Sequence, residues 1–336
     1  MDLFGQEVIF KPDIVPPPVI LDQVKIHNDD SSLNSADIDP SPPRRIIAVG
    51  DLHSDLPNTL KVLKFAGIID DNREWIAQSE DECSQQTRSN LFLISIHLEL
   101  DTTLVQTGDV VDRGPDTKEL FALMRRLTYE APKFGSDVVA LLGNHEVMNM
   151  QNDLRYVTEE DFASFGGREP RAKDFSTSGD LGQYLRSLDL VAKVNGTVFC
   201  HGGITPHWAK VGISTINQSA RRSLFSRTPE EGSLNPVFGA DGPLWDRSYA
   251  QEDEKTICSK LTEALREMNA RRMVVGHTPQ LAGIKSRCRG RVVLIDVGIS
   301  KAYGGRLSAL ELFADSAHAI YEGPIRVKLP RAKAEL

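Results

Sequence analysis

Cysteine is scarce and scattered in this sequence. Its four cysteines, among 336 residues, form no C-x-x-C pair. This spacing argues against a disulfide framework of the kind that stabilises small secreted domains, and against a zinc site built from thiolates. We therefore expect all four to be reduced thiols: Cys83, Cys200, Cys258 and Cys288.

Long apolar runs and an excess of positive charge are also missing. The longest apolar candidate, Leu91–Leu98, is interrupted by Ser95 and His97 and is far shorter than the roughly 20 apolar residues of a membrane-spanning helix. The net charge of -8 offers no basic surface to a nucleic-acid backbone. We therefore expect neither a membrane nor a nucleic acid as partner. The first residues, MDLFGQEVIF, do not resemble a signal peptide, so the expected location is cytoplasmic.

Composition divides the chain into a leader, a folded domain and a tail. Residues 1–43 contain a PPP run and a polar tract, and they cannot bury much apolar surface, so we predict a flexible leader. The folded domain is predicted to span residues 44–325, which leaves 326–336 as a tail. Residues 76–100 change from polar to apolar without a companion motif and are interpreted as an insertion of uncertain structure. Deleting Ser79–Leu100 is expected to leave metal content and activity intact.

Short apolar runs in the folded domain stop repeatedly at a glycine or at a side chain that can bind a metal. Their length and their β-branched residues favour buried strands. Because ligands of α/β proteins gather at the carboxyl ends of strands, we expect the functional site there. The runs are Ile46–Val49, Thr102–Thr107, Val138–Leu142, Thr197–Cys200, Arg272–Val275 and Val292–Ile295.

Helical patterns lie between these runs. In Asp116–Leu127, the apolar residues recur at i, i+3, i+4 and i+7, which is the spacing of one helix face. Residues 151–190 are predicted to be mainly helical, with a break at Gly166-Gly167, and to form a cap over the site. The alternation of strand and helix predicts an α/β fold whose sheets are covered by helices.

Six potential metal ligands follow the predicted strands. Asp51 and His53 lie two positions apart after the first strand, so an extended backbone would point both to one side. Two neighbouring divalent cations need oxygen and imidazole ligands from several loops, with one carboxylate able to bridge them. Each of the remaining candidates follows a different strand: Asp109, Asn144, His201 and His277.

Each of these residues alone has a simpler explanation, because Asp and His at strand ends commonly cap helices or serve as ordinary polar loop residues. The combination is more specific, since GDLH, GDVVDRG, GNHE, HGG and GHT occur in one chain. From about Arg44 to Ala309, the sequence resembles the phosphoprotein phosphatase branch of the calcineurin-like metallophosphoesterases. Within this branch it is most similar to the Shewanella-like protein phosphatases, through TLVQTGDVVDRGPDT, LLGNHEVMNM, GDLGQYLRSL and GPLWDR.

The resemblance implies a metallophosphoesterase fold, with two central β-sheets sandwiched between helices, and a hydrolase that uses two divalent metal ions. Ligands of these types accept Mn, Fe or Zn. The implied ligands are Asp51, His53 and His277 for one ion, Asn144 and His201 for the other, and Asp109 as the bridge.

The resemblance also implies roles around the phosphate. His145 is expected to be the general acid and Asp112 the carboxylate that orients it. Arg113 is expected to clamp phosphate oxygens, because its planar guanidinium matches them, and Asn144 is expected to contact the substrate as well as a metal. Arg247 is the candidate for a second phosphate-binding arginine; the alternative is a solvated arginine after Trp245.

Three further positions carry expectations. Glu146 is expected to support a metal-binding histidine, and Arg186 is expected to be an exposed helical arginine or, as the alternative, to face the site from the cap. Ser54 stands where the family pattern has glycine. Because serine lacks the conformational freedom of glycine, a local backbone difference is expected there.

Three functions compete. The first is a protein phosphatase acting on phosphoserine or phosphothreonine of phosphoprotein substrates. The second is a hydrolase of diadenosine tetraphosphate or another small phosphate ester, although the sequence shows no aromatic residues near the motifs beyond Trp208 and Trp245 to stack against bases. The third, a catalytically silent binding module, predicts damaged ligands, and every candidate ligand is present. The oligomeric state has no signature in the sequence.

Overall fold

The computed structural model of the protein describes residues 44–77, 101–225, 235–323 and 325–332, all of which belong to one compact unit, Ser41–Leu336. The predicted leader 1–43 and residues 78–100 of the predicted insertion lie outside the described residues. The deletion of Ser79–Leu100 therefore stays a prediction.

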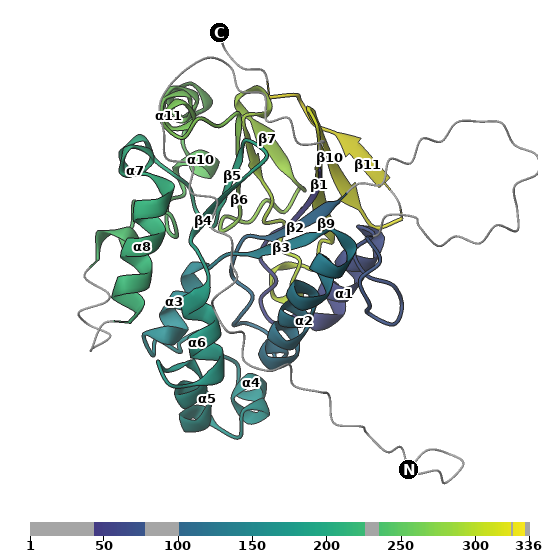
Figure 1. The fold of residues 1–336 in the computed structure, drawn as a ribbon, viewed down its shortest axis with the longest axis vertical. Coiled ribbons are helices and arrows are strands. Elements are labelled where there is room, and N and C mark those ends of the chain that lie inside the picture. The colour runs from purple at the N-terminus through teal and green to yellow at the C-terminus, as the bar shows by residue number, and fades with distance from the viewer. Residues whose placement is uncertain (1–43, 78–100, 226–234, 324, 333–336) are drawn as a thin grey trace, which may run out of the picture. The chain divides into compact units, whose positions relative to one another are not determined.

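Two mixed β-sheets form the centre of this unit, as predicted (Figure 1). The six-stranded sheet has the order β11 (Ile325–Lys328), β10 (Ser316–Tyr321), β9 (Ser308–Phe313), β1 (Arg45–Val49), β2 (Thr102–Gln106) and β3 (Asp137–Ala140). The five-stranded sheet has the order β4 (Val191–Val194), β5 (Thr197–Cys200), β6 (Arg272–Val275), β8 (Val292–Leu294) and β7 (Lys285–Arg287).

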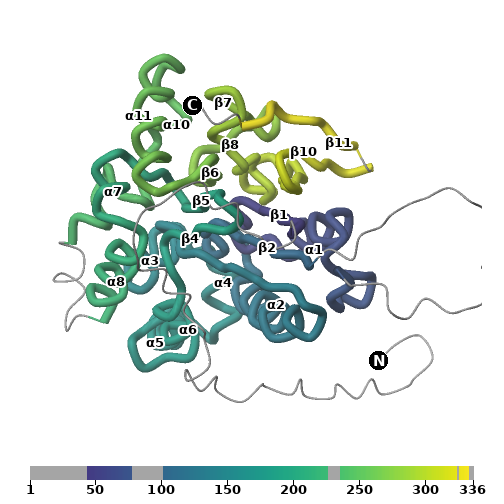
Figure 2. The backbone as a smooth tube through the Cα atoms, turned by 45° about the horizontal axis from the view of Figure 1, so that its top comes forward, coloured from purple at the N-terminus to yellow at the C-terminus, as the bar shows by residue number. Residues whose placement is uncertain are grey.

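Helices cover the two sheets from opposite sides (Figure 1). On the side of the six-stranded sheet lie α1 (Leu56–Phe65) and α2 (Thr117–Glu130). On the side of the five-stranded sheet lie α7 (Pro206–Val211), α8 (Ile213–Leu224), α10 (Ser248–Gln251) and α11 (Glu254–Glu267). A third group gathers around α3, as Figure 2 also shows: α3 (Asn144–Met150), α4 (Glu159–Ser164), α5 (Arg168–Phe175) and α6 (Asp180–Ser187).

The apolar patterns of the sequence explain where these elements are buried. In α2, the predicted face of Leu120, Leu123, Met124 and Leu127 is buried against the core. The four residues of Ile46–Val49 in β1 are all buried, because this strand lies inside its sheet between β9 and β2.

The carboxyl ends of six parallel strands are in register. In the first sheet, Val49 of β1 pairs with Gln106 of β2, which pairs with Ala140 of β3. In the second sheet, Cys200 of β5, Val275 of β6 and Leu294 of β8 are matched in the same way. Each of these strands therefore delivers its following loop at a common edge, where the predicted site residues lie.

The six-stranded sheet extends past the predicted domain end at 325. Strand β11 pairs with β10 from Ile325 to Lys328, so residues 326–328 belong to the sheet and not to the predicted tail 326–336. Among the described residues, no helix combines the length and the apolar character that a membrane crossing requires.

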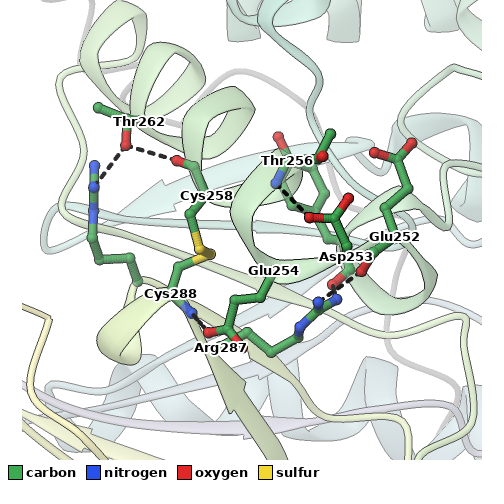
Figure 3. The surroundings of a disulfide bond; sticks show 10 residues. Glu252, Asp253, Glu254, Thr256, Cys258, Thr262, Arg287 and Cys288 are labelled. Atoms are coloured by element: carbon green, nitrogen blue, oxygen red, sulfur yellow. Dashed lines mark hydrogen bonds between the residues drawn. A yellow bond between two sulfur atoms is a disulfide. The ribbon is translucent and has the colours of Figure 1, made fainter.

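The prediction of four reduced cysteines is wrong for one pair. Cys258 in α11 and Cys288, directly after β7, form a disulfide with Cα atoms 5.4 Å apart (Figure 3). No local pattern pointed to this bond, because the partners are 30 positions apart and only the packing of α11 brings them together. Cys200 is a buried free thiol, and Cys83 lies outside the described residues. Because disulfides persist mainly in oxidising compartments, the pair does not favour the predicted cytoplasmic location.

Residues 151–190 are mainly helical, as predicted, and Gly166-Gly167 separates α4 from α5. Neither expectation for Arg186 is correct. This residue belongs to α6, and its side chain is buried in the protein interior. Its guanidinium donates hydrogen bonds to the carbonyl oxygens of Leu224 at 2.7 Å, Gly182 at 2.9 Å and Phe175 at 3.0 Å. Two of these carbonyls, those of Phe175 and Leu224, stand at the carboxyl ends of α5 and α8, where backbone acceptors have no partner within their own helix.

Candidate functional site

The predicted site residues come together at the common edge of the two sheets. A cavity of about 80 Å³ lies there, which is room for a few water-sized groups. Eight predicted residues line it: Asp51, His53, Asp109, Arg113, Asn144, His145, Arg247 and His277. The other two, Asp112 and His201, lie directly behind it in contact with His145 and Asp109.

The loops that carry these residues are held in an uncommon backbone conformation. Six non-glycine residues have left-handed φ angles between 45° and 71°: His53, Ser54, Asp109, Asp112, Arg113 and His277. Such conformations cost about 1–3 kcal/mol each and cluster at functional sites. Ser54 has a φ of 50°, so the serine adopts the conformation that glycine would favour at this position. Its hydroxyl lies 2.7 Å from that of Thr117, which anchors the loop.

Glu146 organises the loop around Asp109. One carboxylate oxygen accepts hydrogen bonds from the backbone N–H groups of Val110 at 2.7 Å and Val111 at 3.2 Å. The other accepts from Asp109 at 2.9 Å and Gly143 at 2.7 Å. We expected Glu146 to support a histidine; instead it fixes the backbone that presents Asp109.

One group of donor atoms surrounds Nε2 of His201. This nitrogen lies 2.8 Å from Oδ1 of Asn144, 3.1 Å from Nδ1 of His277 and 3.2 Å from Oδ2 of Asp109. Ligands bonded to one cation at about 2.0–2.2 Å sit about 3 Å apart, so this spacing suits a shared ion. The distances place His277 with His201 and Asn144, whereas the resemblance implied that His277 joins Asp51 and His53.

A second group shares the same oxygen of Asp109. Oδ2 of Asp109 lies 3.8 Å from Nε2 of His53 and 3.8 Å from Nε2 of His145. Asp51 lines the cavity beside them, and its Oδ1 accepts a hydrogen bond from the backbone N–H of His277 at 3.2 Å. Asp109 therefore stands between two clusters of potential ligands, as a bridging carboxylate must.

Backbone carbonyls fix which nitrogen of each imidazole faces the cavity. Nδ1 of His53 lies 3.0 Å from the carbonyl oxygen of Val111, and Nδ1 of His201 lies 2.9 Å from that of Thr107. A carbonyl can only accept, so Nδ1 carries the proton and Nε2 presents its lone pair towards Asp109. This is the arrangement by which proteins orient metal-binding histidines.

Burial and neighbouring charges shift the pKa values of the ionisable side chains in the site. Burial raises the pKa of Asp51 well above its usual value, and repulsion from Asp296 and Asp109 adds to the effect. Burial lowers the pKa of His53 to about 4 and that of His277 to about 2. Burial also opposes ionisation of Asp109, but His201, His145 and His53 outweigh it and hold the pKa of Asp109 well below its usual range. The two histidines with lowered pKa values, His53 and His277, are thus kept neutral, and neutral imidazole is the form that binds a metal.

His145 and Asp112 form a close pair. Nδ1 of His145 lies 2.6 Å from Oδ2 of Asp112, whose side chain is fully buried. Burial opposes protonation of His145, but the charge of Asp109 and the hydrogen bond to Asp112 outweigh it and raise the pKa of the imidazole. The arrangement keeps a proton available beside the cavity.

Two tyrosines enclose Arg113 at the cavity wall. The guanidinium carbon lies 4.4 Å from the ring centre of Tyr156 and 5.1 Å from that of Tyr303. Nε of Arg113 is buried and has no hydrogen-bond partner among the described residues. The rings hold the guanidinium by cation–π contact and leave its donors for a ligand.

Arg247, directly before α10, reaches the cavity from the side of the five-stranded sheet. Its Nη1 donates to the carbonyl oxygen of His277 at 2.8 Å and to the hydroxyl of Thr278 at 3.1 Å. Trp245, two positions earlier, also lines the cavity. The alternative of a solvated arginine is therefore not favoured.

Sequence reasoning assigned no role to five residues that line the cavity: Tyr156, Trp245, Pro279, Asp296 and Tyr303. Asp296 had a signal, since it comes directly after the last apolar run, yet no role was predicted for it. Its neighbourhood is acidic, and burial raises its pKa to about 6. The tyrosines follow no strand, so the sequence offered no signal for them. Their rings contact His145 and His53 with ring centres 5.0 Å apart, besides enclosing Arg113.

Comparisons with known proteins agree with this geometry. The sequence profile of the calcineurin-like phosphoesterase family matches residues 44–281. An uncharacterised protein of Schizosaccharomyces pombe is 38% identical, over 85% of this chain and 82% of its own. Shewanella-like protein phosphatase 2 of Arabidopsis thaliana is 28% identical, over 82% of this chain and 76% of its own. The structure of a cold-active protein tyrosine phosphatase superimposes with a TM-score of 0.72 at 26% identity, and the match covers 85% of this chain and 78% of that one.

Proposed function

The chain belongs to the calcineurin-like phosphoesterase family, and we propose that it is a dinuclear-metal protein phosphatase of the Shewanella-like type. The observation that carries this proposal is the position of Asp109, whose Oδ2 is shared by two ligand clusters. The catalytic domain starts at residue 44 and includes β11. Residues 151–190 flank the site through Tyr156.

The donor set fits two divalent cations. Asp109, Asn144, His201 and His277 would hold one ion, while Asp51, His53 and Asp109 would hold the other. Nδ1 of His277 and Nε2 of His201 lie only 3.1 Å apart, and the oriented lone pairs of His53 and His201 face a carboxylate, a pairing that needs a cation between them. When bound, such ions neutralise phosphoryl oxygens and make a water acidic enough to act as a nucleophile near neutral pH. Oxygen and imidazole donors suit Mn, Fe or Zn.

The remaining residues bind and protonate the substrate. Arg113, in the loop after β2, and Arg247, directly before α10, line the cavity and bind the phosphoryl oxygens, and Asn144, besides its role as a ligand, adds a polar contact. His145 donates its Nε2 proton to the leaving oxygen, while Asp112 holds Nδ1 and stabilises the imidazolium form.

The size of the cavity favours a phosphorylated side chain over a dinucleotide. About 80 Å³ accommodates a phosphoryl group, whereas an adenosine would need a stacking surface beyond it. The tyrosines at the rim already contact Arg113 and the two histidines. A phosphoprotein substrate can keep most of its structure outside. The intact ligand set argues against a silent binding module.

The test compares phosphopeptides with diadenosine tetraphosphate at matched concentrations, with manganese present and with His145→Ala as the control. We expect the phosphopeptide to be the better substrate and the variant to be strongly impaired. Turnover confined to the dinucleotide would instead support the second function, and a variant as active as the parent would refute the role of His145.

A further inference from the structure

A second layer of buried polar residues lies behind the proposed acid. Oδ2 of Asp112 is occupied by His145, and its Oδ1 accepts a hydrogen bond from Nδ2 of Asn149 at 3.0 Å. A carboxylate held at one oxygen can still rotate about its side-chain bonds. The second contact fixes its plane, and with it the direction of the imidazole.

The orientation of the Asn149 amide is determined by its neighbours. Its Nδ2 faces two groups that can only accept, the carboxylate of Asp112 and the carbonyl oxygen of His145 at 2.9 Å. Its Oδ1 faces Nη1 of Arg171, which can only donate. A flipped amide would place donor against donor and acceptor against acceptor. Arg171 therefore decides which end of Asn149 is presented to Asp112.

Arg171, in α5, is fully buried. Its Nε donates to Oδ2 of Asp161 at 2.9 Å, and its Nη2 lies 3.9 Å from Oδ1 of Asp112. Among the described residues this Nη2 has no hydrogen-bond partner. The guanidinium is also packed against the ring of Phe175, 4.5 Å away. A buried arginine is costly unless its charge is compensated, and here two carboxylates, Asp161 and Asp112, compensate it.

The same network reaches the loop of the first strand. Oδ2 of Asp161 accepts a hydrogen bond from the hydroxyl of Thr117 at 3.0 Å, and that hydroxyl lies 2.7 Å from the hydroxyl of Ser54. Ser54 follows the proposed ligand His53 directly. Hydrogen bonds thus connect Arg171 through Asn149 to the proposed acid, and through Asp161 to the loop of a proposed metal ligand.

The geometry points to Asn149 and Arg171 as positioning residues for the proton transfer. This inference rests on the proposed function. The two residues do not touch the substrate; they hold Asp112 in the plane in which it directs Nε2 of His145 towards the leaving oxygen. General acid catalysis contributes roughly 10²- to 10⁴-fold, so loss of alignment removes part of that factor.

Two substrates with different leaving groups can distinguish a role in proton transfer from a purely structural role of these residues. Nitrophenolate leaves para-nitrophenyl phosphate without needing a proton, whereas the serine alkoxide of a phosphoserine peptide must be protonated as it leaves. A misaligned acid therefore slows the peptide and spares the nitrophenyl ester. General damage to the fold or the metal site slows both alike.

The experiment measures kcat and KM of the metal-loaded protein on both substrates. Asn149→Leu keeps the size of the side chain and removes its three side-chain hydrogen bonds, to Asp112, the carbonyl of His145 and Arg171. The matched control is Asn217→Leu, since Asn217 in α8 makes structural hydrogen bonds to the backbone of Leu190 and Val191. His145→Ala provides the reference for complete loss of the acid.

In Asn149→Leu, we expect kcat for the peptide to fall about tenfold more than kcat for the nitrophenyl ester, with KM little changed. Asn217→Leu should keep the parental ratio of the two rates. A parental ratio in Asn149→Leu would overturn the inference while leaving the proposed function intact, provided that His145→Ala changes the ratio. A parent that hydrolyses neither substrate would overturn both.

A second variant and a readout without turnover cover the case that Asn149→Leu does not fold. Arg171→Lys keeps the charge but lacks the fork that reaches Asp161 and Asn149 together, so the ratio should change in the same direction. The proton on Nδ1 of His145 should give a downfield resonance in NMR spectra, assigned by its loss in His145→Ala. We expect this resonance to shift or broaden in both network variants and to stay in place in Asn217→Leu; an unmoved resonance in both would contradict the inference.

Discussion

Replacing Glu146 by glutamine tests how the loop around Asp109 is held. The carboxylate accepts four backbone hydrogen bonds, two on each oxygen. In Glu146→Gln one oxygen becomes an NH₂ group, which can only donate and must face two N–H donors. The side chain keeps its size, so the change affects hydrogen bonding and charge while it leaves the packing nearly intact.

The expected cost can be worked out from these contacts. A hydrogen bond to a charged group contributes about 1.5–3 kcal/mol, so losing two amounts to about 3–6 kcal/mol. Total stabilities of single domains are about 5–15 kcal/mol, so this is a large fraction. The cost should fall on the Asp109 loop first, because Asp109 has a φ of 57° and relaxes once its N–H loses its partner.

Two measurements check the prediction. Urea unfolding of chelated protein reports the loss of stability, and elemental analysis reports how many metal ions each chain retains. The control is Glu119→Gln, which removes the same charge from an exposed position on α2 and should change stability by less than about 0.5 kcal/mol. If Glu146→Gln matched the parent in both measurements, the carboxylate would not be the group that holds the loop, and our account of Asp109 would fail.

Three further predictions concern the metal site, the pH dependence and the disulfide. Asp109→Asn should lower the metal content from two ions per chain towards none, because both clusters share this carboxylate; elemental analysis that still finds two ions would contradict the bridging role. In the chelated protein, the contribution of His53 to stability should be lost as the pH falls from 6.5 towards 4, because the unfolded chain then protonates His53 while the folded chain, with a pKa of about 4, does not; urea midpoints of the parent and of His53→Asn between pH 7 and 4.5 measure this, and a difference between the two that does not change with pH would contradict it. Reduction of Cys258–Cys288 should lower the unfolding free energy by about 3–4 kcal/mol, from a closed loop of 30 residues; Cys258→Ser should make the urea midpoint insensitive to reductant, and a parent that is equally insensitive would show that the bond does not stabilise the fold.

The convergence of the candidate ligands was predictable because strands impose a fixed geometry on the residues that come directly after them. Asp51, Asp109 and His201 each come within three positions of the end of a parallel strand. Once the strands are in register, residues that follow the strand ends by one to three positions lie close together. The prediction of an α/β fold with sheets covered by helices is confirmed for the same reason, since it depended on the pattern of apolar runs, whereas the number of sheets was implied by the resemblance.

Grouping of the ligands was less predictable than their identity. The resemblance paired His277 with Asp51 and His53, and the structure places its ring beside His201. The direction of a side chain depends on its own backbone angles, and His277 has a left-handed φ of 65°. A motif specifies the residue and not its backbone angles, so the two groupings differ where the backbone departs from regular structure.

The two tyrosines and the buried arginine that support the site had no sequence signal. Tyr156 and Tyr303 reach Arg113 from segments far apart in the chain, and Arg171 reaches Asn149 from the helical segment predicted only as a cap. These contacts depend on how α3, α4 and α5 pack, which no local spacing encodes. The Cys258–Cys288 disulfide escaped prediction for the same reason.

Strain at the site explains why it needs such supports. Six left-handed residues, at about 1–3 kcal/mol each, would relax in an isolated loop. The strands cannot prevent this, because the hydrogen bonds between strands end before the positions of the candidate ligands. The hydrogen bonds that hold these loops come instead from Glu146, from Thr117 and Asp161, and from the backbone carbonyls that orient His53 and His201. Catalytic geometry in this protein therefore depends on side chains that contact neither metal nor phosphate, and substitutions of these residues should lower activity before they unfold the sheets.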